Sequence, residues 1–188
     1  MLNSSINISG LVIAMSSSKK ARYYDIECPI SKDGTILVRI KLPVETGKDL
    51  SDTGRILTVN DGRLYKSKDS SKTAFAVSAT QATASKGFYG NSVSLIGDVV
   101  SNIKTTKDTA EFMMTDLSVP KDLQLNIHVI CENPGEKFHI KKGDKVAIIG
   151  GHVDIIRSDK NSDFVIRTSP NRLHPIPFFD GEEDAATL

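Results

Sequence analysis

The sequence of 188 residues is long enough for one domain or for two small ones. A hydrophobic fraction of 39% and a formal net charge of +1 are typical of a folded protein and exclude a largely disordered chain. The longest apolar runs, such as residues 146–149, are far too short to cross a bilayer, and no basic and apolar leader opens the chain, so a cytoplasmic location is expected.

The charges are distributed unevenly along the chain. Residues 180–188 carry four acidic side chains and no basic one, which leaves the remainder with a net charge of +5. Residues 1–85 hold 12 basic and 8 acidic residues, whereas residues 86–179 hold 12 and 11. A mildly basic body with an acidic tail permits contact with a polyanion without requiring it.

In chain order, the clearest strand pattern of the first half covers residues 36–42, where Ile36, Val38, Ile40 and Leu42 alternate with Leu, Arg and Lys. This period of two predicts a strand with one buried face, and residues 125–131 repeat it. Polar segments rich in Ser, Lys, Asp and Gly are predicted to be hairpin loops at 16–20, 31–34, 66–73, 104–109 and 157–163. Helical periodicity is scarce, and short turns are expected near 45–53 and 134–142.

An internal repeat relates the two halves of the chain. Residues 6–13 align with residues 93–100 at an offset of 87, and from residue 36 onward the offset is 89. Under the second offset Gly54 falls on Gly143 and Gly62 on Gly151, and the stretch 54–77 needs no gap. Few residues are identical, so the match rests on the alternate positions at which apolar residues occur and on the positions of the glycines. Together these predict a duplication.

The repeat predicts an all-β protein of two tandem five-stranded OB-fold barrels. Each half has the element order expected of an OB-fold, which is five strands with one turn or helix between the third and the fourth. The first barrel is expected over residues 1–84, a linker over 85–90, the second barrel over 91–176 and an acidic tail over 177–188. Gly54 and Gly143 would begin the fourth strands, where a sharp bend suits glycine.

Four stretches of the second half follow a recognisable order. They are residues 91–99 (NSVSLIGDV), 110–115 (AEFMMT), 126–131 (NIHVIC) and 141–151 (KKGDKVAIIGG). This order resembles the bacterial-type single-stranded DNA-binding proteins, whose first strand reads Asn-x-Val-x-Leu-x-Gly and whose fourth is entered through Lys-Gly-Asp-x-Val. The resemblance covers residues 91–170 and, more faintly, 4–80, and it implies the fold more than the ligand.

Three features depart from that family. The chain has no Trp, whereas the family commonly stacks bases on Trp and Phe. It ends in AATL and not in the acidic run with Pro-Phe that usually recruits partners. It also has two predicted barrels, as some members do, and because those members dimerise, the resemblance implies a homodimer.

Unpaired nucleic-acid strands are bound without sequence specificity by a basic groove that follows the phosphates and by aromatic rings that stack on the bases. In a small barrel this groove crosses strands two and three, between the loops joining strands one and two and strands four and five. The candidate nucleic-acid-binding residues of the first half are Lys19, Lys20, Arg22, Tyr23, Arg39, Lys41, Tyr65, Lys66, Lys68 and Lys72. Those of the linker and the second half are Phe88, Tyr89, Lys104, Lys107, His128, Arg157, Lys160 and Arg167. Because the first half is the more basic one, it is expected to make more of the phosphate contacts.

Each candidate also has a simpler interpretation. The lysines suit any solvated hairpin, Tyr23 could pack at a sheet edge, and Phe88 with Tyr89 could cover the seam between the barrels. The residues expected in the core by parity are Tyr24, Phe75, Phe112, Phe164 and Cys131. The four histidines are scattered and no catalytic motif is found, so neither an enzyme nor a bound metal or cofactor is expected.

The sequence therefore predicts a protein that binds and protects single-stranded DNA in replication, recombination or DNA transfer, at the nucleoid or, for a viral source, in the host cytoplasm. The tail, with Phe178 and Phe179 beside acidic residues, could dock on replication or recombination proteins, compete for the protein's own groove, or be a disordered end. Two alternatives stay open. One is a structural or adaptor subunit of a protein assembly, favoured by the missing Trp and the near-neutral second half, and the other is an RNA-binding protein. No membrane partner is expected.

Overall fold

The computed structural model describes residues 4–31, 34–47, 50, 53–66, 75–88, 91–118, 120–136, 138–157 and 162–176. Within these ranges the chain forms strands and three short 3-10 turns, without an α-helix. The predicted tail over 177–188 lies outside the described residues, as do the candidates Lys68, Lys72, Tyr89 and Lys160.

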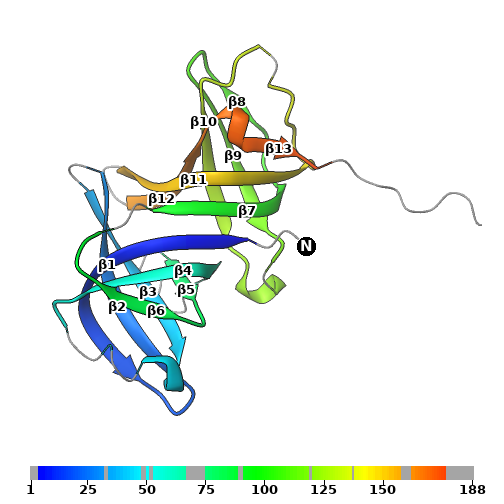
Figure 1. Ribbon diagram of the computed structural model, residues 1–188. Helices are drawn as coiled ribbons and strands as arrows, with labels where there is room; N and C mark the ends of the chain where they lie inside the picture. The colour runs from blue at the N-terminus through cyan, green and yellow to red at the C-terminus, as the bar shows by residue number, and fades with distance from the viewer. Residues whose placement is uncertain are drawn as a thin grey trace, which may run out of the picture.

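Five strands of the first half pair in a closed ring (Figure 1). They are β1 (Ser5–Ser17), β2 (Ala21–Ser31), β3 (Gly34–Pro43), β4 (Ile56–Tyr65) and β5 (Phe75–Ser78). The order is β1-β2-β3-β5-β4, and β1 pairs back onto β4. The β3–β5 pairing is parallel and the others are antiparallel. A short strand, β6 (Ala82–Ser85), also pairs with β4.

Five strands of the second half pair in the same order. They are β7 (Ser92–Val99), β9 (Thr109–Asp116), β10 (Asn126–Glu132), β11 (Lys145–Arg157) and β12 (Ser162–Thr168). The order is β7-β9-β10-β12-β11, β11 pairs back onto β7, and β10–β12 is the parallel pair. Two short strands, β8 (Lys104–Thr105) and β13 (Leu173–Pro175), add to β9 and β11.

The core follows the alternation seen in the sequence. Ile36, Val38, Ile40 and Leu42 are at most 5% exposed, as predicted, because successive side chains of a strand point to opposite faces. The predicted core positions Tyr24, Phe75, Phe112 and Cys131 are also buried, whereas the side chain of Phe164 lies outside the described parts. Ile130 is one departure: parity directs it outward, yet it is 3% exposed, and Ala76 and Val165 are buried at outward positions in the same way.

The two rings share one hydrogen-bonding register. Equivalent cross-strand pairs are Ile6–Gly62 and Val93–Gly151, Ile8–Val59 and Leu95–Ile148, and Ile40–Val77 and Val129–Ile166. These pairs agree with the offsets of 87 and 89 found in the sequence. The match therefore extends from apolar parity to backbone geometry.

The predicted bends at Gly54 and Gly143 are confirmed. Their φ angles are +86° and +95°, a region that glycine enters without steric cost. The backbone N–H of Gly54 donates to the carbonyl of Val12 at 2.9 Å, and that of Gly143 donates to the carbonyl of Val99 at 2.8 Å. Each bend thus fixes the entry of β4 or β11 against the ring's first strand.

The rings are joined edge to edge through β1 and β7, which lie side by side across the middle of the molecule (Figure 1). Residues 5–7 of β1 pair antiparallel with residues 92–94 of β7. The Ser4 hydroxyl donates to Oδ1 of Asp116 at 2.7 Å and accepts from the backbone N–H of Ile96 at 3.1 Å. All strands consequently belong to one sheet that closes on itself twice.

The turns differ from the sequence predictions more than the strands do. The first expected turn is a 3-10 turn, η1 (Val44–Gly47), but the described residues of 134–142 contain no helical turn. The second half instead has η2 (Lys121–Leu123) and η3 (Pro170–Arg172). The predicted loop at 16–20 is shorter, because Ser16 and Ser17 pair with β2 and so satisfy their backbone groups within the sheet.

Candidate nucleic-acid interface

We call the side of β2, β3, β5 and β4 that points away from the first core the first outer face. Its residues alternate with the buried Tyr24, Ile40, Val77 and Leu64. Cross-strand pairing arranges them in two rows across the ring. The first row is Tyr23, Lys41, Ser78 and Arg63, and the second row is Asp25, Arg39, Ala76 and Tyr65.

The second row contains an ion pair between neighbouring strands. Nε and Nη2 of Arg39 donate to the two carboxylate oxygens of Asp25 at 2.7 and 2.9 Å, a two-point contact that fixes the guanidinium. Burial and the nearby Tyr23 raise the pKa of Tyr65 above its ordinary value, and Arg39 acts in the opposite direction. Tyr65 is therefore a neutral phenol at physiological pH, close to both Tyr23 and Arg39.

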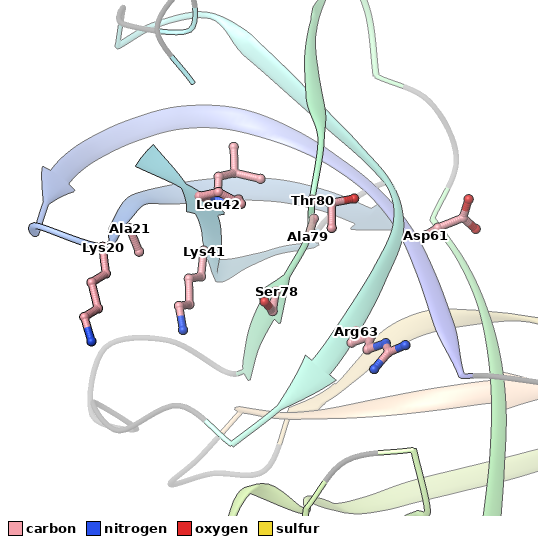
Figure 2. Close-up of a pocket in the computed structure, with 10 residues that line it drawn as sticks. Lys20, Ala21, Lys41, Leu42, Asp61, Arg63, Ser78, Ala79 and Thr80 are labelled. Atoms are coloured by element: carbon pink, nitrogen blue, oxygen red, sulfur yellow. The ribbon is translucent and has the colours of Figure 1, made fainter. Parts of the chain in front are cut away.

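Lys41, Ser78 and Arg63 of the first row border an open hollow of about 680 Å³ (Figure 2). Its lining residues are Lys20, Ala21, Lys41, Leu42, Pro43, Asp61, Arg63, Ser78, Ala79 and Thr80. In Figure 2 the side chains of Lys20 and Lys41 extend to the same side, with Ser78 between Lys41 and Arg63, and Asp61 points away from them. Among the residues that the structure describes, no carboxylate forms an ion pair with Lys20, Lys41 or Arg63. The hollow is thus a cationic surface.

The corresponding surface of β9, β10, β12 and β11, here the second outer face, has different chemistry. Its rows are Glu111, Ile130, Arg167 and His152, and Met113, His128, Val165 and Asp154. Nε2 of His128 lies 3.4 Å from a carboxylate oxygen of Glu111. Arg167 donates through Nη1 to Glu132 at 3.2 Å and through Nε to Asp154, and the bond with Asp154 is the main reason why its pKa is raised.

Equivalent positions of the two faces therefore differ in charge. Tyr23, Lys41, Ser78 and Arg63 of the first face correspond to Glu111, Ile130, Arg167 and His152 of the second. Across both rows the first face has three cations and one carboxylate, whereas the second has one arginine and two carboxylates, with histidines formally neutral. A polyanion would meet an attractive first face and a self-neutralised second face.

Comparison with solved structures identifies the fold. The chain matches a deletion mutant of the single-stranded DNA-binding protein from Thermus aquaticus with a TM-score of 0.62 and 21% sequence identity, over 97% of this chain and 98% of that chain. The fold is that of the Thermus aquaticus protein. A murine DNA-binding protein bound with double-stranded DNA also matches, at a TM-score of 0.36 and 11% identity, over 97% of this chain and 100% of that chain. No protein-family model and no curated protein matches the sequence.

The structure brings together part of the predicted site. Lys20, Tyr23, Arg39, Lys41 and Tyr65 lie on or beside the first outer face, and Lys19 is exposed in the β1–β2 turn. The prediction for Arg22 is wrong, because Arg22 belongs to β2, shares the inward parity of Tyr24 and lines a separate hollow with it. Lys66 follows β4 directly and is exposed, and Phe88 is 51% exposed. In the second half, Lys104 and Lys107 are exposed at β8 and the turn after it, and Arg157 ends β11.

Arg63 was missed by the sequence analysis. The signal was present, because the inward positions Gly62 and Leu64 flank it, and alternation then directs Arg63 outward. No group of three His, Cys, Asp or Glu side chains within the described ranges could hold a metal ion. None of the helical turns in those ranges is long and apolar enough to cross a membrane.

Proposed function

We propose that the protein binds single-stranded DNA without strong sequence preference, as two tandem OB-fold barrels of which the first makes most of the contacts. The observation that carries this proposal is the first outer face, where Lys20, Lys41 and Arg63 line one hollow and Tyr23 and Tyr65 lie beside it. The closed five-strand pairing of each half and the similarity in fold to a single-stranded DNA-binding protein support it.

The contacts divide into two kinds. Lys20, Lys41 and Arg63 bind phosphates, whose neutralisation releases counterions and makes affinity fall with salt by a logarithmic slope of about 0.7 per contact for single strands. Tyr23 and Tyr65 stack on bases, at about 1–3 kcal/mol per base, and take the place of the missing Trp. Neither kind reads base identity, so the protein would coat exposed strands during replication, recombination or DNA transfer.

Assembly is the second part of the proposal. We expect a homodimer, which would place four barrels around one strand, and an acidic tail over 177–188 that contacts replication or recombination proteins. This tail would also compete with DNA for the cationic hollow, since both are polyanions. Deleting residues 180–188 should then raise the affinity for DNA at low salt, and an unchanged affinity would remove the competition.

Fluorescence anisotropy with labelled oligo-dT, oligo-U and duplex tests the main proposal. The expected result is tight, salt-sensitive binding to oligo-dT and much weaker binding to duplex, because stacking needs unpaired bases. Stronger binding to oligo-U would indicate an RNA-binding protein. An absence of salt-sensitive binding to any of the three would contradict the proposal.

One observation favours a second function for the second ring. On its outer face Arg167 pairs with Asp154 and Glu132, and His128 lies beside Glu111. These side chains therefore interact with one another within the protein. A face of this kind suits a structural or adaptor role. If the protein shows no salt-sensitive binding to oligo-dT, oligo-U or duplex, a structural or adaptor role becomes the better explanation for both rings.

A further inference from the structure

The first outer face ends at β4, and one segment of the second ring lies directly beyond it. The backbone N–H of Lys66, the residue after β4, donates to the carbonyl of Leu123 at 3.0 Å. Leu123 closes η2, so this turn of the second ring touches the end of β4. In Figure 1 the short yellow-green turn lies beside the strands of the first ring.

This turn holds an exposed cation on an anchored backbone. The side chain of Lys121 is exposed, whereas Leu123 is half-buried. The N–H of Leu123 donates to the carbonyl of Pro120 at 2.9 Å, and Leu123 is bonded to Lys66 through its own carbonyl. The first bond closes the turn and the second ties its end to the residue after β4, so the backbone loses little conformational freedom when its lysine binds a phosphate. Asp122, also exposed, is the adjacent opposing charge.

The second outer face is a less favourable binding surface for a single strand of DNA. Arg167 is already bonded to Asp154 and Glu132, and Glu111 lies beside His128. A phosphate arriving there would have to displace these carboxylates and would be repelled by them. Beyond β4, the exposed cations Lys66 and Lys121 are the more favourable continuation.

We propose that a single strand bound on the first outer face continues over the end of β4 onto η2, where Lys121 contacts a phosphate, and does not cross the second outer face. This inference rests on the proposed function. It adds a residue of the second ring to the binding site and predicts the direction in which a long strand leaves the first ring.

The test measures oligo-dT binding by the full chain for two lengths: one of about 8 nucleotides, which a single barrel can hold, and one of about 30, which extends past it. The variants are Lys121→Ala, Asp122→Asn and a control, Lys142→Ala, an exposed lysine of the second ring at the bend before Gly143. We expect Lys121→Ala to weaken binding of the long strand three- to tenfold relative to the control and to lower its salt slope by about 0.7. Asp122→Asn should tighten binding of the long strand. Neither Lys121→Ala nor Asp122→Asn should change binding of the short strand.

The outcomes separate the two proposals. If wild-type protein binds neither length in a salt-sensitive way, the proposed function itself is wrong. If wild-type protein binds both lengths but Lys121→Ala matches Lys142→Ala on the long strand, the path over η2 is wrong. Equal losses by Lys121→Ala on both lengths would also overturn it, because Lys121 would then belong to the first site. Circular dichroism of each variant confirms that the fold is intact.

Discussion

At the residue scale, the basic side chains of the first outer face are of two kinds. Arg39 is bound at two points by Asp25 and shares its row with Tyr65. Lys41, on the same strand, borders the cationic hollow and has no ion pair among the described residues. The first kind organises the face, and the second remains available to a phosphate.

This distinction predicts different results for two substitutions on β3. Lys41→Ala should lower the salt slope of oligo-dT binding by about 0.7, with little change in the free energy of unfolding. Arg39→Ala should reduce the free energy of unfolding by about 1 kcal/mol, because the Asp25 carboxylate, whose side chain is 19% exposed, loses its partner. Urea unfolding and anisotropy titrations measure the two effects. A larger stability loss for Lys41→Ala than for Arg39→Ala would contradict this division.

Cys131 gives a prediction about pH. Burial in the core raises the pKa of its thiol to about 11, and the neighbouring Glu132 acts in the same direction. In the unfolded chain the thiol ionises near its ordinary value, so between about pH 9 and pH 11 only the unfolded state releases this proton. The free energy of unfolding should therefore fall with rising pH in this window. Cys131→Val removes the thiol, and the fall should be smaller in this variant; an identical fall would show that other groups cause it.

At the scale of elements, the sequence predicted the strands better than the turns between them and the ion pairs across them. Alternation located β3 and β10, and the offsets of 87 and 89 matched the registers of the two rings, because both signals arise from which side chains are buried. The 3-10 turns η2 and η3 have no periodicity and could not be predicted in this way. Ion pairs such as Arg39–Asp25 depend on cross-strand register, which the sequence of a single strand does not contain.

Gly62 of β4 and Gly151 of β11 test the equivalence of the rings. A Cβ at Gly62 would lie 2.4 Å from Cγ1 of Val77, and one at Gly151 would lie 3.0 Å from Cγ2 of Ile166, the equivalent residue. Alanine at either position overpacks the core, which costs about 1–3 kcal/mol. We expect Gly62→Ala to be the more destabilising of the two in urea unfolding. A neutral Gly62→Ala would contradict the close approach of β4 to β5.

At the scale of the whole molecule, the two rings form one continuous sheet. The β1–β7 pairing, the buried contact of Ser4 with Asp116, and the bond from the Asn91 side chain to the carbonyl of Pro29 at 3.0 Å hold them together. This edge pairing satisfies backbone groups that a free barrel would expose along β1 and β7. The first and second outer faces are thereby held in a fixed relation, so that their unlike charges can act as one asymmetric surface.

The most direct test of that asymmetry uses Arg63 and His152, which occupy equivalent positions on β4 and β11, and both are exposed. Arg63→Gln and His152→Glu each lower the formal charge by one, with histidine counted as neutral. Oligo-dT affinity measured for both variants at moderate salt should fall clearly for Arg63→Gln and stay close to wild type for His152→Glu. Equal losses at the two positions would contradict the claim that the first ring makes most of the contacts with single-stranded DNA.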